Sequence, residues 1–207
     1  MCIRDRASYD AIESLLTKMA AKVEDGPCVA YVGPGGSGHF VKTVHNGIEY
    51  GIEQILAEAY DLMKRVKNMN GSQMAEVFGL WNNTDELASY LVEITQICLN
   101  TKDELTGEDV VEKILDKAGQ KGTGLWTVVS ALELGISVPT IYASLNARVM
   151  SSLKVQRSEI EKTIQIEAIE DFDLGEITNG RKPLFDAVVL ATIASYAQGM
   201  DLSLIHI

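Results

Sequence analysis

The sequence has few cysteines, and their positions exclude the roles that cysteine most often plays in a fold. The 207 residues include Cys2, Cys28 and Cys98, which form no CxxC pair and no spacing typical of a structural zinc site. A disulfide-stabilised secreted domain is therefore not expected, and a reducing, cytoplasmic location is the default prediction. A signal peptide is not predicted, because MCIRDR at residues 1–6 carries charge and no apolar segment follows it.

Positive charge is also scarce. Lysine and arginine number 18 against 29 aspartates and glutamates, which gives a formal net charge of -11. A surface this acidic repels phosphate backbones and anionic lipid, so neither nucleic acid nor a membrane is a predicted partner. The most apolar stretch, residues 187–197, is shorter than the roughly 20 residues that cross a bilayer, and it contains Ser195 and Tyr196.

Proline is absent from the middle of the chain, which favours one helix after another. The four prolines leave the region from Gly35 to Val138 free, and apolar residues recur there at helical spacing. One short β-prone run, CVAYV at residues 28–32, predicts a strand. Helices are predicted over residues 9–24, 39–67, 72–80, 86–99, 109–118, 126–134, 139–154, 158–170 and 184–197.

Start and stop signals place several of these helix ends. Asn83 followed by Glu86 resembles a capping box, so it predicts the start of the helix over residues 86–99. Gly119 and Gly135 fit helix C-termini. Pro139 suits the first turn of the helix that follows it.

The order of these elements predicts a mainly α fold with two parts. Residues 7–33, one helix and one strand, are expected to be the tail of an α/β domain. Residues 34–200 are expected to form an all-α domain. Residues 1–6 and 201–207 lack helical periodicity and cap chemistry, and we predict that both ends are foreign to the fold.

The glycine-rich turn matches the residue spacing of a dinucleotide-binding motif but not the structural context that the motif requires. Gly33, Gly35 and Gly38 have the GxGxxG spacing and lie between a predicted strand and a predicted helix. That motif also requires a second strand with an acidic residue about 20 residues later, where this sequence is still helical in pattern. Pro34 removes one backbone donor. The turn is therefore interpreted as a strand-to-helix hinge.

The helix predicted over residues 39–67 carries two distinct faces. At about 100° per residue, one face is polar; it holds Lys42, His45, Asn46, Glu49 and Tyr50. The apolar positions centre on another face and comprise Val41, Val44, Ile48, Ile55, Ala59 and Val66. Lys42 and Glu49 stand two turns apart, about 10 Å of rise, so their side chains can converge on one small ligand. The alternative is a solvated polar face with an incidental lysine.

Two glycines interrupt this helix. Gly47 and Gly51 each cost about 1 kcal/mol relative to alanine at an internal helical position. Such positions predict that another part of the chain approaches the helix closely, the alternative being that they are tolerated defects.

The string GPGGSGHFVKTVHNGIEYG, residues 33–51, resembles the strongest signature of the decarboxylating 6-phosphogluconate dehydrogenases. The resemblance continues through residues 55–64, 87–95, 119–127, 147–154 and 195–200, which covers nearly all of the chain between its two ends. The wider β-hydroxyacid dehydrogenase superfamily shares only Gly36, Gly38, Lys42 and Asn46. HNGIEYG and KGTG separate the two families.

The resemblance implies an enzyme of the pentose phosphate pathway that oxidises 6-phosphogluconate with NADP and decarboxylates it to ribulose 5-phosphate, without a metal. It implies that Lys42 is the general base for the C3 hydroxyl, which requires a lysine pKa near neutrality. It also implies that Glu49 protonates C1 of the enediol, and that His45 and Asn46 hold substrate hydroxyl and carboxylate groups.

The same resemblance implies a phosphate clamp made of Tyr50, Lys121 and Arg148, with Thr123 as an extra donor. Arginine suits this role because its guanidinium binds phosphate in a bidentate manner. The alternatives are a solvated loop lysine at position 121 and a packed or ion-paired arginine at position 148. Members of the family are homodimers, and a homodimer is expected here. The resemblance also implies that residues 7–33 are the tail of a Rossmann-like nucleotide-binding domain and that residues 34–200 form an all-helical catalytic and dimerisation domain.

The sequence departs from the family pattern in three places. Leu125 follows KGTG where many relatives carry a second lysine. The family's glycine fingerprint should precede residue 7, so no cofactor-binding residue is assigned. Its final helices should follow Met200. We therefore expect this chain to be inactive alone.

Two further interpretations stay open. Another β-hydroxyacid dehydrogenase, such as one acting on hydroxyisobutyrate, needs no phosphate clamp. A non-catalytic helical dimerisation module would suit the glycines at positions 47 and 51 and the Met- and Val-rich later helices.

Overall fold

The computed structural model describes residues 5–164 and 183–204, and these residues are mainly α-helical, as the sequence predicts. The helices are α1 (Arg6–Met19), α2 (Ser37–Arg65), α3 (Gly71–Trp81), α4 (Tyr90–Asn100), α5 (Thr123–Leu134), α6 (Pro139–Ser152), α7 (Lys154–Thr163) and α8 (Pro183–Leu204). A short 3-10 helix, η1 (Val110–Glu112), precedes α5, and β1 (Lys22–Val23) pairs antiparallel with β2 (Gly26–Pro27).

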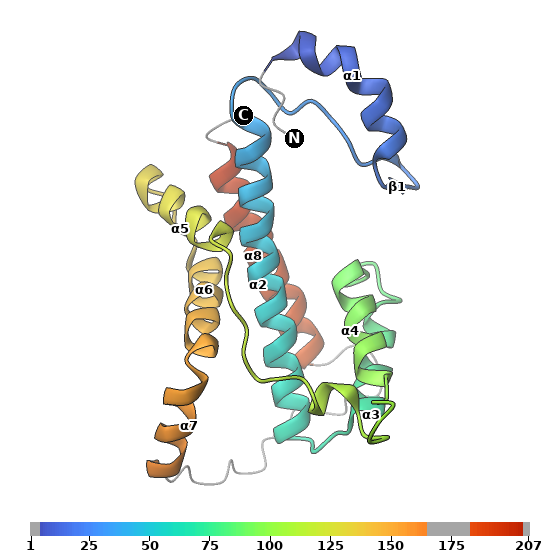
Figure 1. Ribbon diagram of the computed structural model, residues 1–207, viewed down its shortest axis with the longest axis vertical. Helices are drawn as coiled ribbons and strands as arrows, with labels where there is room; N and C mark the ends of the chain where they lie inside the picture. Colours follow the sequence, from blue (N-terminus) through green and yellow to red (C-terminus); the bar gives the residue numbers. More distant parts are fainter. Residues whose placement is uncertain (1–4, 165–182, 205–207) are drawn as a thin grey trace.

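The long helix α2 is the axis of the molecule. In Figure 1, α8 runs antiparallel along α2, with α5 and α6 on one side and α3 and α4 on the other. The C-terminal half of α2 packs with α3, α4 and the start of α8 around the fully buried Met63 and Phe78. The N-terminal half packs with α5, α6 and the end of α8 around Ala131 and Ile141. Both apolar cores therefore depend on one helix.

Helix α8 is longer than the helix predicted over residues 184–197. Its 22 residues are long and apolar enough to cross a membrane by length and composition, although the apolar stretch read from the sequence is shorter. Leu184 and Val188 belong to the first core, and Leu202 is fully buried in the second. We therefore interpret α8 as a core helix of the bundle. Residues 205–207 lie outside the described residues.

The two glycines inside α2 lie where other helices approach it most closely. A Cβ on Gly47 would lie 2.5 Å from Cγ2 of Thr127 in α5, and a Cβ on Gly51 would lie 2.6 Å from Oγ of Ser195 in α8. Gly199 is the corresponding glycine on α8, because a Cβ there would lie 2.4 Å from Cγ1 of Ile48 in α2. The prediction that Gly47 and Gly51 mark close approaches is confirmed.

The strand predicted over residues 28–32 is wrong. That segment has no strand assignment and begins with a bend at Cys28, whose N–H donates to the Ala21 carbonyl at 2.7 Å. An apolar β-prone run becomes a strand only when a neighbouring strand takes up its backbone hydrogen bonds. Within the described residues the only pairing nearby is the two-residue hairpin of β1 and β2.

The helix predicted over residues 109–118 is also wrong. Only η1 forms there, because long-range polar contacts hold the segment in other conformations. The Asp109 carboxylate pairs with Lys102 and accepts from the Gly71 N–H. The Val110 N–H donates to the Thr101 carbonyl at 2.9 Å. Gly119 is therefore not a helix stop.

Other helix ends shift by a few residues. Helix α4 begins after the cap Ser89 and not at Glu86, because the Asn83 side chain bonds back to the Gly79 carbonyl in α3. The capping box occurs at Asn70 and Gln73, at the start of α3. The predicted stop at Gly135 and the predicted first-turn position of Pro139 are confirmed.

The helix predicted over residues 158–170 is observed as α7, which ends at Thr163; residues 165–170 lie outside the described residues. At the other end, Asp5 caps α1 and Arg6 is its first residue, whereas residues 1–4 are not described.

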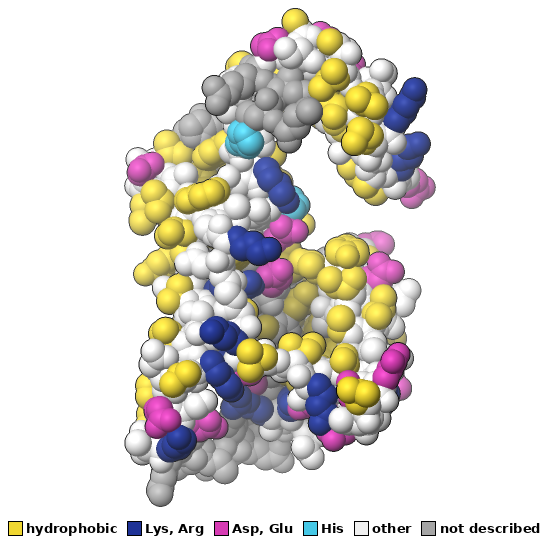
Figure 2. All heavy atoms as spheres, in the orientation of Figure 1, with side chains coloured by type: hydrophobic (Ala, Val, Ile, Leu, Met, Phe, Trp, Pro, Cys, Tyr) yellow, Lys and Arg dark blue, Asp and Glu magenta, His cyan; other side chains and the backbone are white. Residues whose placement is uncertain are grey.

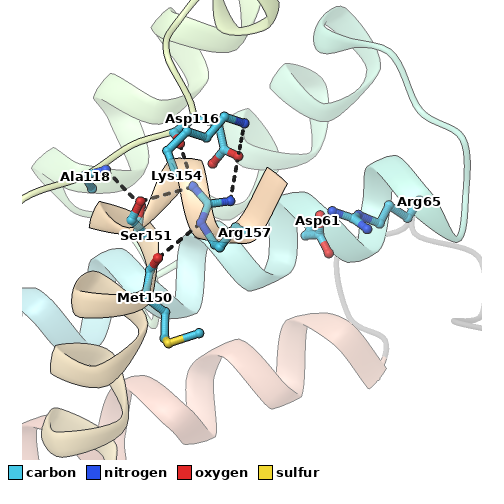
Figure 3. A network of polar contacts seen from close by, with 8 residues as sticks. All are labelled: Asp61, Arg65, Asp116, Ala118, Met150, Ser151, Lys154 and Arg157. Carbon is cyan, nitrogen blue, oxygen red and sulfur yellow. Dashed lines mark hydrogen bonds and ion pairs between the residues drawn. The ribbon is translucent and has the colours of Figure 1, made fainter. Parts of the chain in front are cut away.

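The segment between η1 and α5 crosses the bundle without regular structure and is held by α6 and α7. The Asp116 carboxylate accepts from Arg157 at 2.9 Å and from Lys154 at 3.0 Å (Figure 3). These hydrogen bonds, from Arg157 first and Lys154 second, hold the pKa of Asp116 below its usual value. The segment is thus tied to the bundle by charge-assisted contacts.

We predict that Gly47→Ala destabilises the fold. Its new methyl meets Thr127, which is fully buried and whose hydroxyl is fixed on the carbonyls of Thr43 and Thr123. Overpacking of about 1–3 kcal/mol should exceed the helix-propensity gain of about 1 kcal/mol. Urea unfolding of the chain measures the free energy of unfolding. Gly119→Ala is the control, because a Cβ there meets no heavy atom within 4 Å. Equal stability of the two variants would contradict the close contact.

We predict that Asp116 makes stability depend on acid pH. Because the folded pKa lies below the unfolded value of about 3.9, the contribution is complete above that pH and is lost as the pH falls through the folded pKa. Asp116→Asn should therefore melt below wild type at pH 7, and the gap should close in strong acid. Asp61→Asn is the control, because it removes a surface ion pair within α2, between Asp61 and Arg65. A gap independent of pH would contradict this role.

Candidate active site

The polar face of α2 is solvent-exposed and lies below α1. Figure 2 shows histidine, lysine and acidic side chains gathered on this face, beside a hollow between α1 and α4. Lys42 and His45 are exposed, whereas Asn46, Glu49 and Tyr50 are half-buried. The apolar face of the same helix is buried in the two cores, so the register of α2 is fixed by packing and the polar face is presented as a unit.

Three of the predicted residues converge on one atom of a fourth, Nδ1 of His45. Nδ1 lies 3.3 Å from Lys42 Nζ, 3.3 Å from Glu49 Oε2 and 3.4 Å from Asn46 Oδ1. An unprotonated Nδ1 accepts from the lysine, whereas a protonated Nδ1 donates to the glutamate or the amide oxygen. The tautomer of His45 therefore decides which neighbour it binds. Lys42 and Glu49, two turns apart in sequence, do lean toward a common point.

A second group forms around Arg148 on α6. Its guanidinium carbon lies 4.6 Å from the centre of the Tyr50 ring, a cation–π distance. Its Nη1 donates to the Gly119 carbonyl at 3.2 Å, and its Nη2 pairs with Glu53. The Arg148 side chain is 22% exposed. The ion-paired alternative therefore describes this residue, and the pair with Glu53 leaves further N–H donors on the guanidinium.

The glycine at position 124 explains why Tyr50 lies where it does. A Cβ on Gly124 would lie 2.8 Å from Cε1 of Tyr50, so the ring lies against the backbone of α5. Thr123, the first residue of α5, uses its carbonyl to accept from Thr127. Lys121 is exposed and lies two residues after Gly119, whose carbonyl binds Arg148. The loop that carries Lys121 therefore meets the Tyr50–Arg148 pair.

A cavity of about 290 Å³ borders Lys42 between α1, the glycine-rich turn and the start of α2. Its lining includes Tyr31, Gly33, Gly38 and His39. Within the turn, the Ser37 hydroxyl donates to the Pro34 carbonyl at 2.6 Å. Among the described residues no strand leads directly into the turn, and we assign no residue here to a cofactor.

Glu53 is a charged neighbour of these groups that the sequence analysis missed. It lies on the polar face, four residues after Glu49, so helical spacing alone was sufficient to include it. Its partner Arg148 comes from a helix 95 residues away, and no local signal predicts that contact.

Comparisons with known proteins relate both the sequence and the helical arrangement of this chain to one family. The model of the family described as "6-phosphogluconate dehydrogenase, C-terminal domain" matches residues 38–205. The chain belongs to the 6-phosphogluconate dehydrogenase family. The resemblance read from HNGIEYG and KGTG is thus confirmed for the family.

Relatives of this family match almost the full chain. The "6-phosphogluconate dehydrogenase, decarboxylating" of Synechococcus elongatus is 50% identical over 198 residues, which are 95% of this chain and 42% of that protein. The "6-phosphogluconate dehydrogenase, decarboxylating 1, chloroplastic" of Arabidopsis thaliana is 48% identical over 201 residues, 94% of this chain and 41% of the relative. The chain therefore spans about two fifths of the length of these relatives.

A solved structure has the same fold. The 6-phosphogluconate dehydrogenase of Plasmodium falciparum superposes with a TM-score of 0.86 at 42% identity, covering 96% of this chain and 42% of that chain. It is described in its apo form, with its cofactor NADP+ and with its substrate 6-phosphogluconate. The helical arrangement around α2 is therefore that of the 6-phosphogluconate dehydrogenase family.

Proposed function

We propose that the protein containing this chain oxidises 6-phosphogluconate with NADP and decarboxylates it to ribulose 5-phosphate. The observation that carries the proposal is the convergence of Lys42 and Glu49 on Nδ1 of His45. These residues lie within the segment that the family model matches. A base and an acid held around one point suit a reaction that removes a proton at one stage and returns one at another. NADP, when bound, supplies the acceptor for the C3 hydride.

Lys42 and Glu49 are the proposed catalytic residues. The Lys42 amine takes the proton of the C3 hydroxyl as that carbon is oxidised, and later returns a proton to the keto oxygen when carbon dioxide leaves. Glu49 protonates C1 of the resulting enediol. His45 and Asn46 bind the hydroxyl and carboxylate groups, as the contacts of His45 with both catalytic side chains and with Asn46 favour.

Tyr50, Lys121 and Arg148 are the proposed phosphate clamp. Arg148 lies against the Tyr50 ring, and the loop carrying Lys121 binds Arg148 through Gly119. A hydroxyisobutyrate-type dehydrogenase has no phosphate to bind and no use for this arrangement. The grouping therefore favours a phosphorylated sugar acid as substrate.

A homodimer is the proposed assembly. Apolar side chains stay exposed along α8 at Leu190, Ile193 and Met200, and on α5 at Trp126 and Leu132. Apolar surface of this kind is typical of an interface with further protein. We also propose a cytoplasmic location. The relatives include cyanobacterial and chloroplastic proteins.

We predict that Lys42→Met lowers kcat for 6-phosphogluconate by about 10²–10⁴-fold, the usual contribution of a general base. NADPH formation is followed in a chimera in which this chain replaces the matching segment of the Synechococcus relative. Lys162→Met, which removes the partner of Glu159 on α7, is the control. A Lys42→Met chimera with the kcat of the control would refute the assignment. The same substitution at the aligned position of the relative repeats the test if the chimera does not fold.

We predict that Lys121→Ala raises KM for 6-phosphogluconate about tenfold or more, because a hydrogen bond to a charged group is lost. The kcat/KM for unphosphorylated gluconate should change little. Lys117→Ala, another exposed lysine of the same loop, is the matched control. Unchanged affinity in Lys121→Ala would favour the hydroxyisobutyrate-type alternative.

A further inference from the structure

The loop that carries Lys121 is fastened to α6 and α7 at three successive points. Asp116 binds Arg157 and Lys154, the Ala118 N–H donates to the Ser151 hydroxyl at 2.8 Å, and the Gly119 carbonyl accepts from Arg148. The helix residues at positions 148, 151 and 154 are three apart, so they follow one side of α6 into α7. Figure 3 shows Ser151, Lys154 and Arg157 turned toward Asp116 and Ala118.

Arg157 joins the end of α6 to this loop. Its Nη1 donates to the Asp116 carboxylate and its Nη2 to the Asp116 carbonyl at 2.7 Å. The same guanidinium donates to the carbonyls of Met150 and Ser151, at 3.1 Å each. Those carbonyls belong to the last turn of α6, where the i to i−4 hydrogen-bond pattern ends. The Arg157 side chain therefore fixes the loop and the end of α6 relative to each other.

The downstream end of the loop is fixed independently. Gly122 adopts φ +102°, a conformation that L residues rarely adopt, and it is the N-cap of α5. α5 is held on α2 by the Gly124–Tyr50 contact and by the Thr127 hydroxyl on the Thr43 carbonyl at 2.8 Å. Lys121 thus lies between two anchored ends, and the backbone at that position has little freedom to move.

We propose that Ser151, Lys154 and Arg157, with Asp116, form a loop clip that positions Lys121 toward Arg148 for the phosphate of the substrate. The inference rests on the function proposed above. These four are positioning residues, because they act through the loop backbone and not on the substrate. Helix α6 carries both Arg148 and Ser151, and Arg157 of α7 bonds the last turn of α6, so the two clamp residues share one support. A shift of about 1 Å in such a support is enough to weaken a binding geometry.

The experiment compares Arg157→Gln and Ser151→Ala with two matched variants. Arg65→Gln removes an arginine that pairs with Asp61 in a surface contact away from the loop, and Ser151→Thr keeps the hydroxyl. Tryptic cleavage after Lys117 and Lys121 in the chain itself reports loop fastening. Steady-state kinetics in the Synechococcus chimera report KM and kcat.

We expect Arg157→Gln and Ser151→Ala to speed cleavage in the loop and to raise KM for 6-phosphogluconate about fivefold, the ratio that corresponds to one hydrogen bond of typical strength. The kcat should fall less than about twofold, since the residues around His45 are untouched. Ser151→Thr should restore both values, and Arg65→Gln should match wild type.

Faster cleavage without a change in KM would overturn the proposal, as would a KM equally raised in Arg65→Gln. Lys121→Ala, measured in parallel, separates the two levels of inference. If it raises KM and the clip variants do not, the clip fails and the proposed function stands. If Lys121→Ala and the clip variants all leave KM unchanged, the phosphate clamp itself is refuted.

Discussion

The structure depends on the close approach of α5 and α8 to one segment of α2. Gly47 and Gly51 allow these contacts, because any side chain at either position would overlap Thr127 or Ser195. Gly199 allows the same from the side of α8. Helices that approach this closely cannot rotate about their axes without losing contact on both sides. The direction of every polar side chain on α2 follows from that fixed register.

The same contacts link the two groups of the candidate site. The register of α2 sets the positions of Lys42, His45 and Glu49. Arg148 lies on α6, and the Gly119 carbonyl that it binds lies in the loop before α5. Tyr50 connects them, since it shares a face with Glu49, lies under Arg148 and packs on Gly124. A change at the α2–α5 contact would therefore act on the proposed clamp and on the proposed acid–base residues together.

The sequence predicted the parts of this arrangement that depend on local periodicity. Helical spacing placed Lys42, His45, Asn46 and Glu49 on one face, and glycines inside a helix indicated close packing. It failed where long-range polar contacts decide the backbone. The segment over residues 109–118 has a helical pattern, yet Asp109 and Asp116 are bound by Lys102 and by Arg157. Likewise residues 28–32 have strand chemistry and no strand beside them among the described residues.

In the proposed phosphate clamp, the pairing of Arg148 with Glu53 explains how an acidic chain keeps a partly buried cation where an anion would bind. A partly buried guanidinium loses hydration, and a carboxylate beside it compensates that loss. Arginine has five N–H donors, and contacts with Glu53 and Gly119 use only some of them. A phosphate that approaches the remaining donors meets the nearby negative charge of Glu53 as well. The second cation at Lys121 offsets that repulsion, which is why the position of its loop matters as much as the arginine.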